Sequence, residues 1–491
     1  MWLASGLLGA FILSLVVSNF FIPQDKAVTR QMLGHDFLAF YAAGSFVRDG
    51  RYHDLYNLDA IRDFEQATSR ATGLEVGKSF GPWWNPPFYA MVFQPLAAYS
   101  YIQALNIWRA ISAVAALASI AFLTTMLARA IPKPIVSLPP LRLWQIDKPP
   151  ARAKTEARRV QAFLKMHPDA RSDDDETQSR PSRGWAYWLL VPTIALLSMP
   201  FIQAFSHGQN TFTSLLLLCI TIGLWRREKG FVAGLVGGLL FYKPQLAAVV
   251  AGVMLLDLGI PAVAGFTVMG LVLLGATQLI MPGSIGDFLH QLPANVRWMQ
   301  VEHTYLWERH VTLKAFWRLL FQGREAGEAL KITTALSYAS IGAMGLLLLR
   351  SAWRSSRVPQ AELFAGEALD RSVQRDRLIA ATISTMPLLM PFYFDYDLLL
   401  LSVPITLYAA ERIRRPELVR SNDKWLTRSL VCLYLWTFVN PGLATLSHVN
   451  LSVIFLSASS LLFIARANRE PEIVVVETTT APTIERPRLA A

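Results

Sequence analysis

Long apolar blocks separated by short charged segments are the feature that most limits what this chain of 491 residues can fold into. Hydrophobic residues make up 53% of the sequence and gather in blocks such as residues 189–199, 215–224 and 246–256. Charged residues make up only 16%, whereas soluble domains carry roughly 25%. A soluble layered fold cannot bury so many apolar blocks, and this composition also excludes a disordered protein. We therefore predict an all-α polytopic membrane protein whose main solvent is the lipid bilayer.

The distribution of charge predicts the side of the membrane on which each loop lies. The chain has 46 Lys and Arg and 35 Asp and Glu, a net charge of +11. The excess lies mainly in loops beside apolar segments, as in cytoplasmic loops, so no nucleic-acid partner is expected. The loops predicted to be cytoplasmic are residues 131–184, 226–229, 351–378 and 411–428. Residues 283–311 contain only two basic residues, Arg297 and Arg309, and are predicted to be external.

Apolar runs predict about twelve membrane spans with both chain ends in the cytoplasm. The candidate spans are residues 2–22, 86–99, 102–129, 185–202, 211–225, 231–242, 245–258, 259–281, 331–350, 379–394, 397–411, 429–443 and 451–466. The first is taken as a retained span rather than a signal peptide, because no basic segment follows Met1. The charges require one net crossing between residues 86 and 129, and three prolines suggest that the stretch 86–99 is bent or re-entrant.

Four regions follow from this pattern. Residues 1–130 contain the first spans and a long external loop, 23–85, and residues 131–184 form a cytoplasmic, partly disordered loop. Residues 185–466 form the transmembrane bundle, and residues 467–491 form a disordered cytoplasmic tail. The external loop is expected to be helical: an amphipathic helix starts near Asp36, and a second one covers about residues 58–67.

Several short motifs in this loop and beyond it occur in a fixed order. Asp-Phe-Leu-Ala-Phe-Tyr-Ala-Ala-Gly starts at Asp36, Gly-Arg-Tyr starts at Gly50, and Asn-Pro-Pro-Phe starts at Asn85. His-Gly-Gln-Asn follows from His207, and a glycine-rich run ends in Lys-Pro at Lys243. This set, over about residues 30–250, resembles the polyprenol-phosphate-sugar-dependent glycosyltransferases of family 87, which include the actinobacterial mannosyltransferases of phosphatidylinositol mannoside synthesis. The resemblance implies a GT-C fold, with the active site under the first external loop.

The resemblance implies that Asp36 is the general base that takes the proton from the acceptor hydroxyl. A partly desolvated carboxylate at the membrane surface suits that role. The alternative is that Asp36, directly before a helix, is only its N-cap. His35 and Tyr41 are placed with the substrate-binding residues, although a solvated histidine at the interface is the favoured interpretation of His35.

Three cationic or ionisable residues are candidates for binding the donor phosphate. Lys243 lies at the outer end of its predicted span, where a lone cation can hold a lipid phosphate or simply snorkel to the interface. Arg309 and His310 end the second external loop, among aromatic residues that suit either a substrate or an ordinary interface belt. Phosphate is the leaving group, so cations there would meet the main electrostatic need of the reaction.

The remaining candidates are polar residues in short external turns. His207, Gln209 and Asn210 are candidates for substrate contact or plain turn and cap residues. Asp395 and Asp397 are candidates for binding sugar hydroxyls or for a polar turn. No metal site and no cofactor are expected, because no phosphate loop, HExxH motif or nucleophile triad occurs and both cysteines lie in apolar blocks.

The predicted function is inverting transfer of mannose or another hexose or pentose from a polyprenyl-phosphate donor to a glycolipid or glycan acceptor. The reaction is placed on the outer face of the cytoplasmic membrane, where nucleotide sugars are not supplied. A transporter or flippase of lipid-linked sugars is the alternative, although no internal repeat is evident. A glycan ligase or polymerase of similar topology is a third interpretation, and the early acidic loop argues against it.

Overall fold

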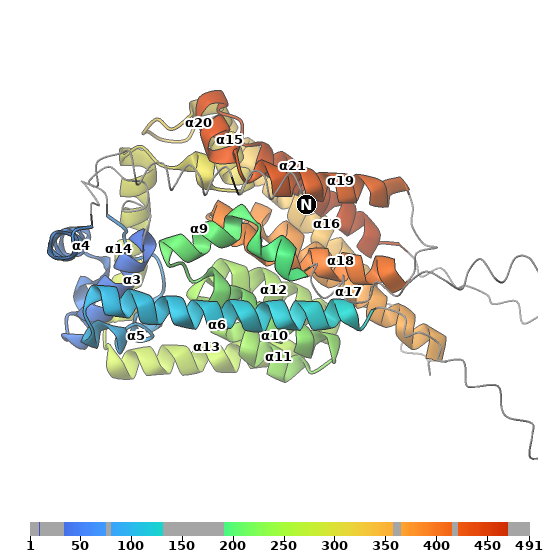
Figure 1. The fold of residues 1–491 in the computed structure, drawn as a ribbon, viewed down its shortest axis with the longest axis horizontal. Helices are drawn as coiled ribbons and strands as arrows, with labels where there is room; N and C mark the ends of the chain where they lie inside the picture. Colours follow the sequence, from blue (N-terminus) through green and yellow to red (C-terminus); the bar gives the residue numbers. More distant parts are fainter. Residues whose placement is uncertain are drawn as a thin grey trace, which may run out of the picture.

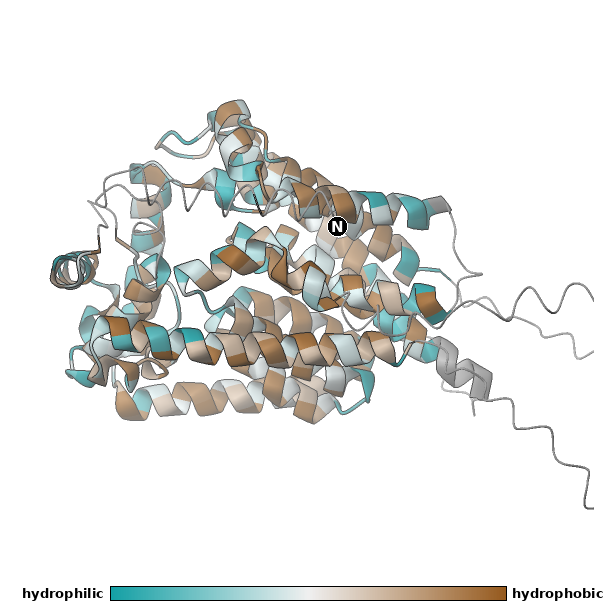
Figure 2. Cartoon of the chain, viewed as in Figure 1, coloured by the Kyte–Doolittle hydropathy of each residue, from teal (hydrophilic) through white to brown (hydrophobic). Residues whose placement is uncertain are grey.

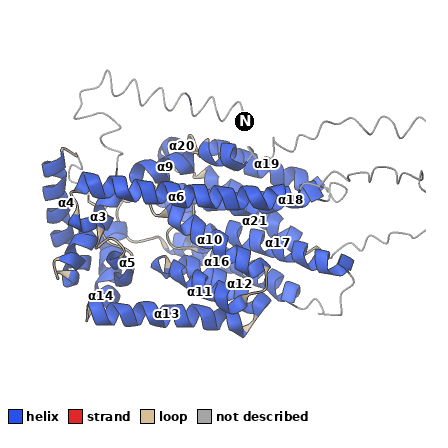
Figure 3. Ribbon diagram, turned by 60° about the horizontal axis from the view of Figure 1, so that its bottom comes forward, coloured by secondary structure: helices blue, strands red, loops and turns tan. Residues whose placement is uncertain are grey.

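The computed structural model describes residues 34–74, 80–130, 191–356, 365–414 and 421–469, together with Gly9. Every regular element in these ranges is a helix, and the only strand-like contact among them is an isolated bridge between His310 and Phe394 (Figure 3). The all-helical prediction is therefore confirmed. The predicted first span, the loop 131–184 and the tail after residue 469 lie outside the described residues.

Three described helices are long and apolar enough to cross a membrane: α6 (Tyr101–Ala128), α13 (Ile260–Ile280) and α16 (Lys331–Ser356). Two bent pairs raise this number to five if each pair forms one span. One is α9 (Met199–His207) with α10 (Thr211–Arg226), bent by 119°, and the other is α19 (Ser421–Trp436) with α20 (Asn440–Ser447), bent by 87°. Apolar residues cover most of α6 and α13 (Figure 2). The chain is a helical membrane protein, and the total of about twelve spans stays a prediction.

The candidate span 86–99 is wrong as a membrane helix. It contains only the short helices α5 (Pro87–Met91) and η2 (Leu96–Ala98), which are far below the roughly 20 residues that a crossing needs. Proline at three positions explains the breaks, because it lacks the backbone N–H that a continuing helix uses. A capping box of Ser100 and Gln103 then starts α6. Between residues 86 and 129 one helix is therefore long and apolar enough to cross a membrane, which agrees with the single net crossing expected from the loop charges and with the bend expected from the prolines.

A glycine-rich contact fixes the middle of the bundle. The helices α11 (Gly230–Gly238) and α13 approach so closely that a Cβ on Gly234 would collide with the carbonyl oxygen of Ala262. Small residues allow this packing between membrane helices. After α11, the chain continues through η5 (Leu239–Tyr242) into α12 (Pro244–Leu258), and Lys243 occupies the break between them. The Gly-rich motif thus positions a single lysine at a helix break.

The described ends of the loops predicted to be cytoplasmic gather at one end of the bundle (Figure 1, right). The helices that end or begin there include α10, α17 (Ala365–Leu389), α18 (Ser402–Arg414), α19 and α21 (Leu451–Ala467). Ion pairs join them: Arg226 Nε donates to Asp376 Oδ1 at 2.6 Å, and Arg377 Nη2 donates to Glu411 Oε1 at 2.6 Å. These pairs hold the helix ends together.

The two segments predicted to be external meet at the opposite end (Figure 1, left). The first segment forms α3 (His35–Arg48), η1 (Tyr52–Tyr56) and α4 (Leu58–Thr72), and the second begins with α14 (Ser284–Arg297). His53 Nδ1 lies 2.6 Å from Asp287 Oδ2, and Asn295 Nδ2 donates to the Tyr56 carbonyl at 2.7 Å. The second segment continues through η6 (Trp298–Glu302) and η7 (Trp307–Arg309) into α15 (Leu313–Gln322). Their placement outside the membrane stays a prediction.

Candidate active site

The first turn of α3 is attached to the end of α9. Gly34 N donates to the Ser206 carbonyl at 2.8 Å, and Trp108 Nε1 donates to the Gly208 carbonyl at 2.8 Å. Gly208 ends α9 with φ of 71°, a left-handed conformation that glycine adopts at little cost. A Cβ at Gly208 would also lie only 2.9 Å from Phe37 Cβ. The His-Gly-Gln-Asn motif is therefore a tight helix end that faces Asp36.

Asp36 accepts two side-chain hydrogen bonds from that motif. His207 Nδ1 lies 3.1 Å from Asp36 Oδ2, and Gln209 Nε2 donates to the same oxygen at 2.6 Å. The N-cap interpretation of Asp36 is wrong, because Gly34 occupies the N-cap position and Asp36 lies within the first turn. The Asp36 side chain remains 35% exposed, whereas that of His207 is only 10% exposed. A carboxylate that is held in place yet accessible can reach a substrate.

The charge state of Asp36 reflects opposing influences. Burial alone would raise its pKa, but the hydrogen bonds and charges of His207, Gln209 and Arg309 outweigh this effect and hold the pKa below its usual value. Asp36 is therefore ionised at neutral pH. Only the ionised form can accept a proton, so the site is prepared for a general base.

Lys243 is not the lone cation that the sequence suggested. Its Nζ donates to both carboxylate oxygens of Asp397, at 2.9 Å each, and Thr211 Oγ1 donates to Asp397 Oδ1 at 2.7 Å. The Lys243 and Asp397 side chains are only 14% and 8% exposed. A cation at this depth needs a counter-charge, because burial of an unpaired charge is costly. An ammonium has three N–H donors, so a third remains for a ligand.

Arg309 forms a second cation–carboxylate pair beside the first. Its Nη2 and Nε donate to the two oxygens of Asp395, at 2.9 and 3.4 Å. The guanidinium carbon lies 5.8 Å from the Phe394 ring centre and 5.9 Å from that of Tyr396. Tyr396 separates Asp395 from Asp397 in η8 (Asp395–Leu401), so this one short helix holds both cations. The two aspartates thus have identified partners, and neither simply marks a polar turn.

His310 lies next to this site as a neutral side chain. It is 1% exposed, and its main chain forms the bridge to Phe394. Burial, with the charges of Arg309 and Lys314, lowers its pKa to about 3. An uncharged imidazole cannot supply the positive charge that the sequence interpretation assigned to it. Of the three residues predicted to bind the donor phosphate, only Lys243 and Arg309 therefore have a positive charge to offer.

The other predicted residues are divided between the site and its surroundings. Asn210 is 2% exposed and directly precedes Thr211, and His35 begins α3 beside Asp36. Tyr41 points elsewhere, since its hydroxyl donates to the Tyr99 carbonyl at 2.9 Å. Thr211 and Tyr396 were not among the site residues predicted from the sequence. The only available signal was their position beside Asn210 and between two aspartates.

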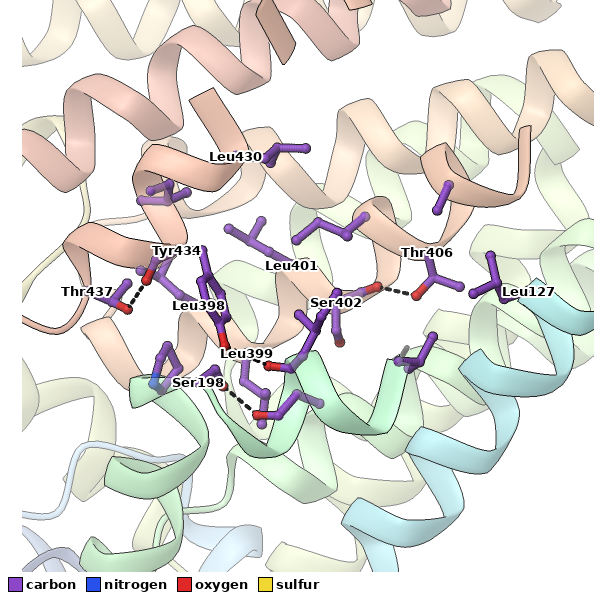
Figure 4. A pocket seen from close by; sticks show the side chains of 17 residues that line it. Leu127, Ser198, Leu398, Leu399, Leu401, Ser402, Thr406, Leu430, Tyr434 and Thr437 are labelled. Atoms are coloured by element: carbon purple, nitrogen blue, oxygen red, sulfur yellow. Dashed lines mark hydrogen bonds between the residues drawn. The ribbon is translucent and has the colours of Figure 1, made fainter. Parts of the chain in front are cut away.

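An apolar pocket of about 120 Å³ is lined in part by η8 residues (Figure 4). The helix η8 joins the pocket to the polar site, because its first residues carry the aspartates and Leu398, Leu399 and Leu401 line the pocket. Most polar side chains in the lining bond to the backbone, as Tyr434 Oη does with the Leu197 carbonyl at 2.7 Å, whereas Ser402 Oγ has no hydrogen-bond partner among the described residues. The lining residues come mainly from residues 191–200, α18 and α19: Val191, Ile194, Ala195, Ser198, Pro200, Ser402, Ile405, Thr406, Ala409, Leu430, Leu433 and Tyr434. The pocket suits an apolar ligand.

One buried carboxyl near the site predicts a pH dependence of stability. Glu65 in α4 is 1% exposed, and burial raises its pKa to about 8, although Gly81 N donates to its Oε2 at 2.9 Å. In the unfolded chain, the Glu65 carboxyl loses its proton near its ordinary acidic pKa. In the folded protein, the same carboxyl stays protonated until the pH approaches 8. The stabilisation is thus complete at low pH and is lost as pH rises toward 8, by about 1 kcal/mol per pH unit.

Glu65→Gln is therefore expected to flatten the fall in thermal stability of the purified protein between pH 5 and 8, within roughly the window of the Glu65 shift. Asp63→Asn, an exposed change on the same helix, is the matched control and should follow the wild type. If the melting temperatures of Glu65→Gln and the wild type fall equally between pH 5 and 8, Glu65 does not ionise as described.

The chain is a helical membrane protein with an enzyme-like polar site. The site consists of the Asp36 carboxylate and two ion pairs, Lys243 with Asp397 and Arg309 with Asp395. The family model of glycosyltransferase family 87 matches residues 83–369, more than half of the 491 residues. The chain therefore belongs to glycosyltransferase family 87, and its activity is that of a glycosyltransferase. Neither a curated protein nor a solved structure matches the chain.

The matched range includes the turn at His207, Lys243 and Arg309, but it does not include Asp36 or the aspartates of η8. Family membership therefore identifies the reaction class, whereas the roles of these three carboxylates rest on geometry. Among the described residues, no group of three or more His, Cys, Asp and Glu side chains has the arrangement of a metal site.

Proposed function

We propose that this glycosyltransferase moves a sugar from a polyprenyl-phosphate donor to a glycolipid or glycan acceptor with inversion at the anomeric carbon. The observation that carries the proposal is an ionised, accessible carboxylate, Asp36, within electrostatic range of Arg309, together with a second cation, Lys243. The two cations are bound by Asp395 and Asp397, which flank Tyr396. The reaction needs those two kinds of group: a base for the acceptor and positive charge for the leaving phosphate.

In the proposed step, the acceptor oxygen attacks the anomeric carbon while its proton passes to Asp36. The bond between that carbon and the phosphate oxygen breaks, and its electron pair stays on the phosphate. His207 and Gln209 hold the Asp36 carboxylate in place through the hydrogen bonds at 3.1 and 2.6 Å. Arg309 and Lys243 stabilise the negative charge that develops on the phosphate.

The aspartates of η8 keep these cations in position before the donor binds. Arg309 uses two of its five N–H donors on Asp395, and the others remain for a phosphate. A bound phosphate would also offset the positive field of Arg309, which helps to hold down the pKa of Asp36. Donor binding would then make Asp36 a stronger base, so that proton removal is favoured only when the leaving group is in place.

The apolar pocket beside η8 supports a lipid-linked donor. A polyprenyl chain needs an apolar environment next to the site that binds its phosphate, and the pocket and the cations share one helix. A nucleotide sugar has no such apolar group. The outer face of the cytoplasmic membrane is the proposed location, because residues 283–311, at the site end of the bundle, contain only two basic residues, Arg297 and Arg309. Mannose is the leading sugar, with other hexoses and pentoses as alternatives.

The donor class is tested with the full-length protein in liposomes. Radiolabelled mannose supplied as a polyprenyl phosphate should appear in an extractable glycolipid or glycan, whereas the nucleotide sugar should give no product. Mass spectrometry of membrane glycolipids from cells with and without the gene then identifies the acceptor by its missing sugar unit. Transfer from the nucleotide sugar alone, or flux of intact lipid-linked sugar without transfer, would contradict the proposal.

A further inference from the structure

A second group of cations lies on α15, away from the paired cations of the active site. Lys314 and Arg318 are four residues apart, so they share one face of this helix. Lys314 Nζ lies 5.8 Å from the Trp307 ring centre and 5.5 Å from that of Phe392, and Arg318 Cζ lies 5.8 Å from the Trp307 ring centre. The two cations therefore converge on one aromatic residue.

This group has more hydrogen-bond donors than acceptors. Arg318 and Trp307 are each 3% exposed, yet Arg318 Nη1 and Trp307 Nε1 have no hydrogen-bond partner within the described residues. Arg318 Nη2 donates to the Glu325 and Gly327 carbonyls at 2.9 Å each, and Lys314 Nζ donates to Gln300 Oε1 at 3.0 Å. In the same described ranges, neither cation forms a salt bridge.

The contrast with the active site makes this arrangement unusual. Lys243 and Arg309 each have an aspartate as a direct partner, whereas Lys314 and Arg318 have only neutral oxygens. Burial lowers the pKa of Lys314, and the Arg318 charge lowers it further. Glu325 and Glu328 act on the Arg318 charge, but neither carboxylate forms a salt bridge with it among the described residues. Unsatisfied buried donors and a buried cation without a direct counter-ion are unfavourable, so an anion that accepts these hydrogen bonds would stabilise the group.

Neutral aromatic groups separate these cations from the active site. His310 is close enough to feel the charges of both Arg309 and Lys314. Tyr305 stacks on its ring at 5.1 Å, and the Phe392 ring centre lies 6.2 Å from it. Tyr305 and Trp307 belong to a small apolar cluster apart from the main core. Figure 1 places α15 and α20 at the top of the bundle, above the level of α3. The α15 cations therefore have their own enclosure.

We propose that Lys314, Arg318 and Trp307 form a separate binding site for a phosphate group, either on a lipid headgroup or as free phosphate. A phosphate offers several strong acceptor oxygens to the ammonium, the guanidinium fork and the indole N–H. The α15 helix also presents Phe321, 44% exposed, on an amphipathic surface that suits the membrane interface. This site does not depend on the proposed donor or acceptor of the transfer reaction.

The first test uses inorganic phosphate and the full-length protein in dodecyl maltoside, at constant ionic strength. Lys314→Gln should lower the affinity for phosphate at one class of site by at least about tenfold, equal to about 1.4 kcal/mol. Lys331→Gln removes the same charge from an exposed position at the start of α16 and is the matched control. The readout is the phosphate-dependent rise in melting temperature, with the phosphate-free value as a check of folding.

Trp307→Phe keeps the aromatic ring and removes only the indole N–H, so it serves as a second variant that does not change charge. It should weaken phosphate binding less than Lys314→Gln does. The second arm adds phosphatidylglycerol to the micelles and counts the lipids that each variant retains in native mass spectrometry. Loss of retained lipid in Lys314→Gln but not in Lys331→Gln identifies a headgroup site.

Binding of inorganic phosphate without lipid retention identifies a free-phosphate site instead. If Lys314→Gln and Trp307→Phe match Lys331→Gln in both arms, any phosphate that the protein binds lies elsewhere and the proposal is overturned. Transfer activity is not part of either readout, so this result leaves the proposed function unaffected.

Discussion

Asp36→Asn is expected to lower the rate of sugar transfer by about two to four orders of magnitude, the range that general acid–base catalysis contributes. The change preserves the size and shape of the side chain. The remaining carbonyl oxygen can still accept the hydrogen bond that Gln209 Nε2 donates at 2.6 Å. An amide cannot take the proton of the acceptor hydroxyl, however. The affinity for the donor lipid should change little, because Lys243 and Arg309 are retained.

The matched control is Asp54→Asn, which removes an acidic residue from the same segment of the chain. Asp54 lies in η1, 2.7 Å from Arg51 Nη2, and has no contact with His207 or Gln209 among the described interactions. Transfer is measured in liposomes at saturating donor, and the donor KM is measured separately. Full transfer by Asp36→Asn would exclude Asp36 as the base, and loss of transfer in Asp54→Asn would point to Asp54 instead.

Most members of the site could be found from sequence, but their pairing could not. Asp36 was a candidate through the family resemblance, the turn at His207 and the aspartates near 395 as polar residues in external turns, and Lys243 as a cation at the end of a span, where such residues are rare and functional. The same reasoning shows that a buried lysine needs a partner. It does not identify Asp397, which lies 154 residues further along the chain.

Burial was the second quantity that sequence patterns did not reveal. His310 occurs in a polar segment, which favours an exposed and titratable histidine, yet its side chain is enclosed by Tyr305, Phe392 and Phe394. The stretch 86–99 shows the opposite limit. Its apolar composition predicted a span, whereas its prolines restrict it to two short helices. Hydropathy reports only which residues are apolar. Whether a residue is buried, or a stretch forms a long helix, depends on its contacts in three dimensions and on its prolines.

Lys243→Gln is expected to abolish most transfer and also to destabilise the protein, for two different reasons. The variant leaves the Asp397 carboxylate, 8% exposed, without its counter-charge, and breaking such a pair costs on the order of 3–5 kcal/mol. It also removes a cation from the position proposed for the leaving phosphate. A single variant cannot separate these effects, because a less stable enzyme also loses activity.

The double variant Lys243→Gln with Asp397→Asn separates them. The two neutral amides of this variant can hydrogen-bond to each other and to Thr211 Oγ1. In the wild type, Thr211 Oγ1 donates to Asp397 Oδ1 at 2.7 Å. The melting temperature should return to near the wild-type value, because no uncompensated charge remains. Transfer should stay low, and the donor KM should stay high, because the cation is still missing. Recovery of transfer together with stability would mean that Lys243 only neutralises Asp397, and the stabilisation of the leaving phosphate would then rest on Arg309 alone.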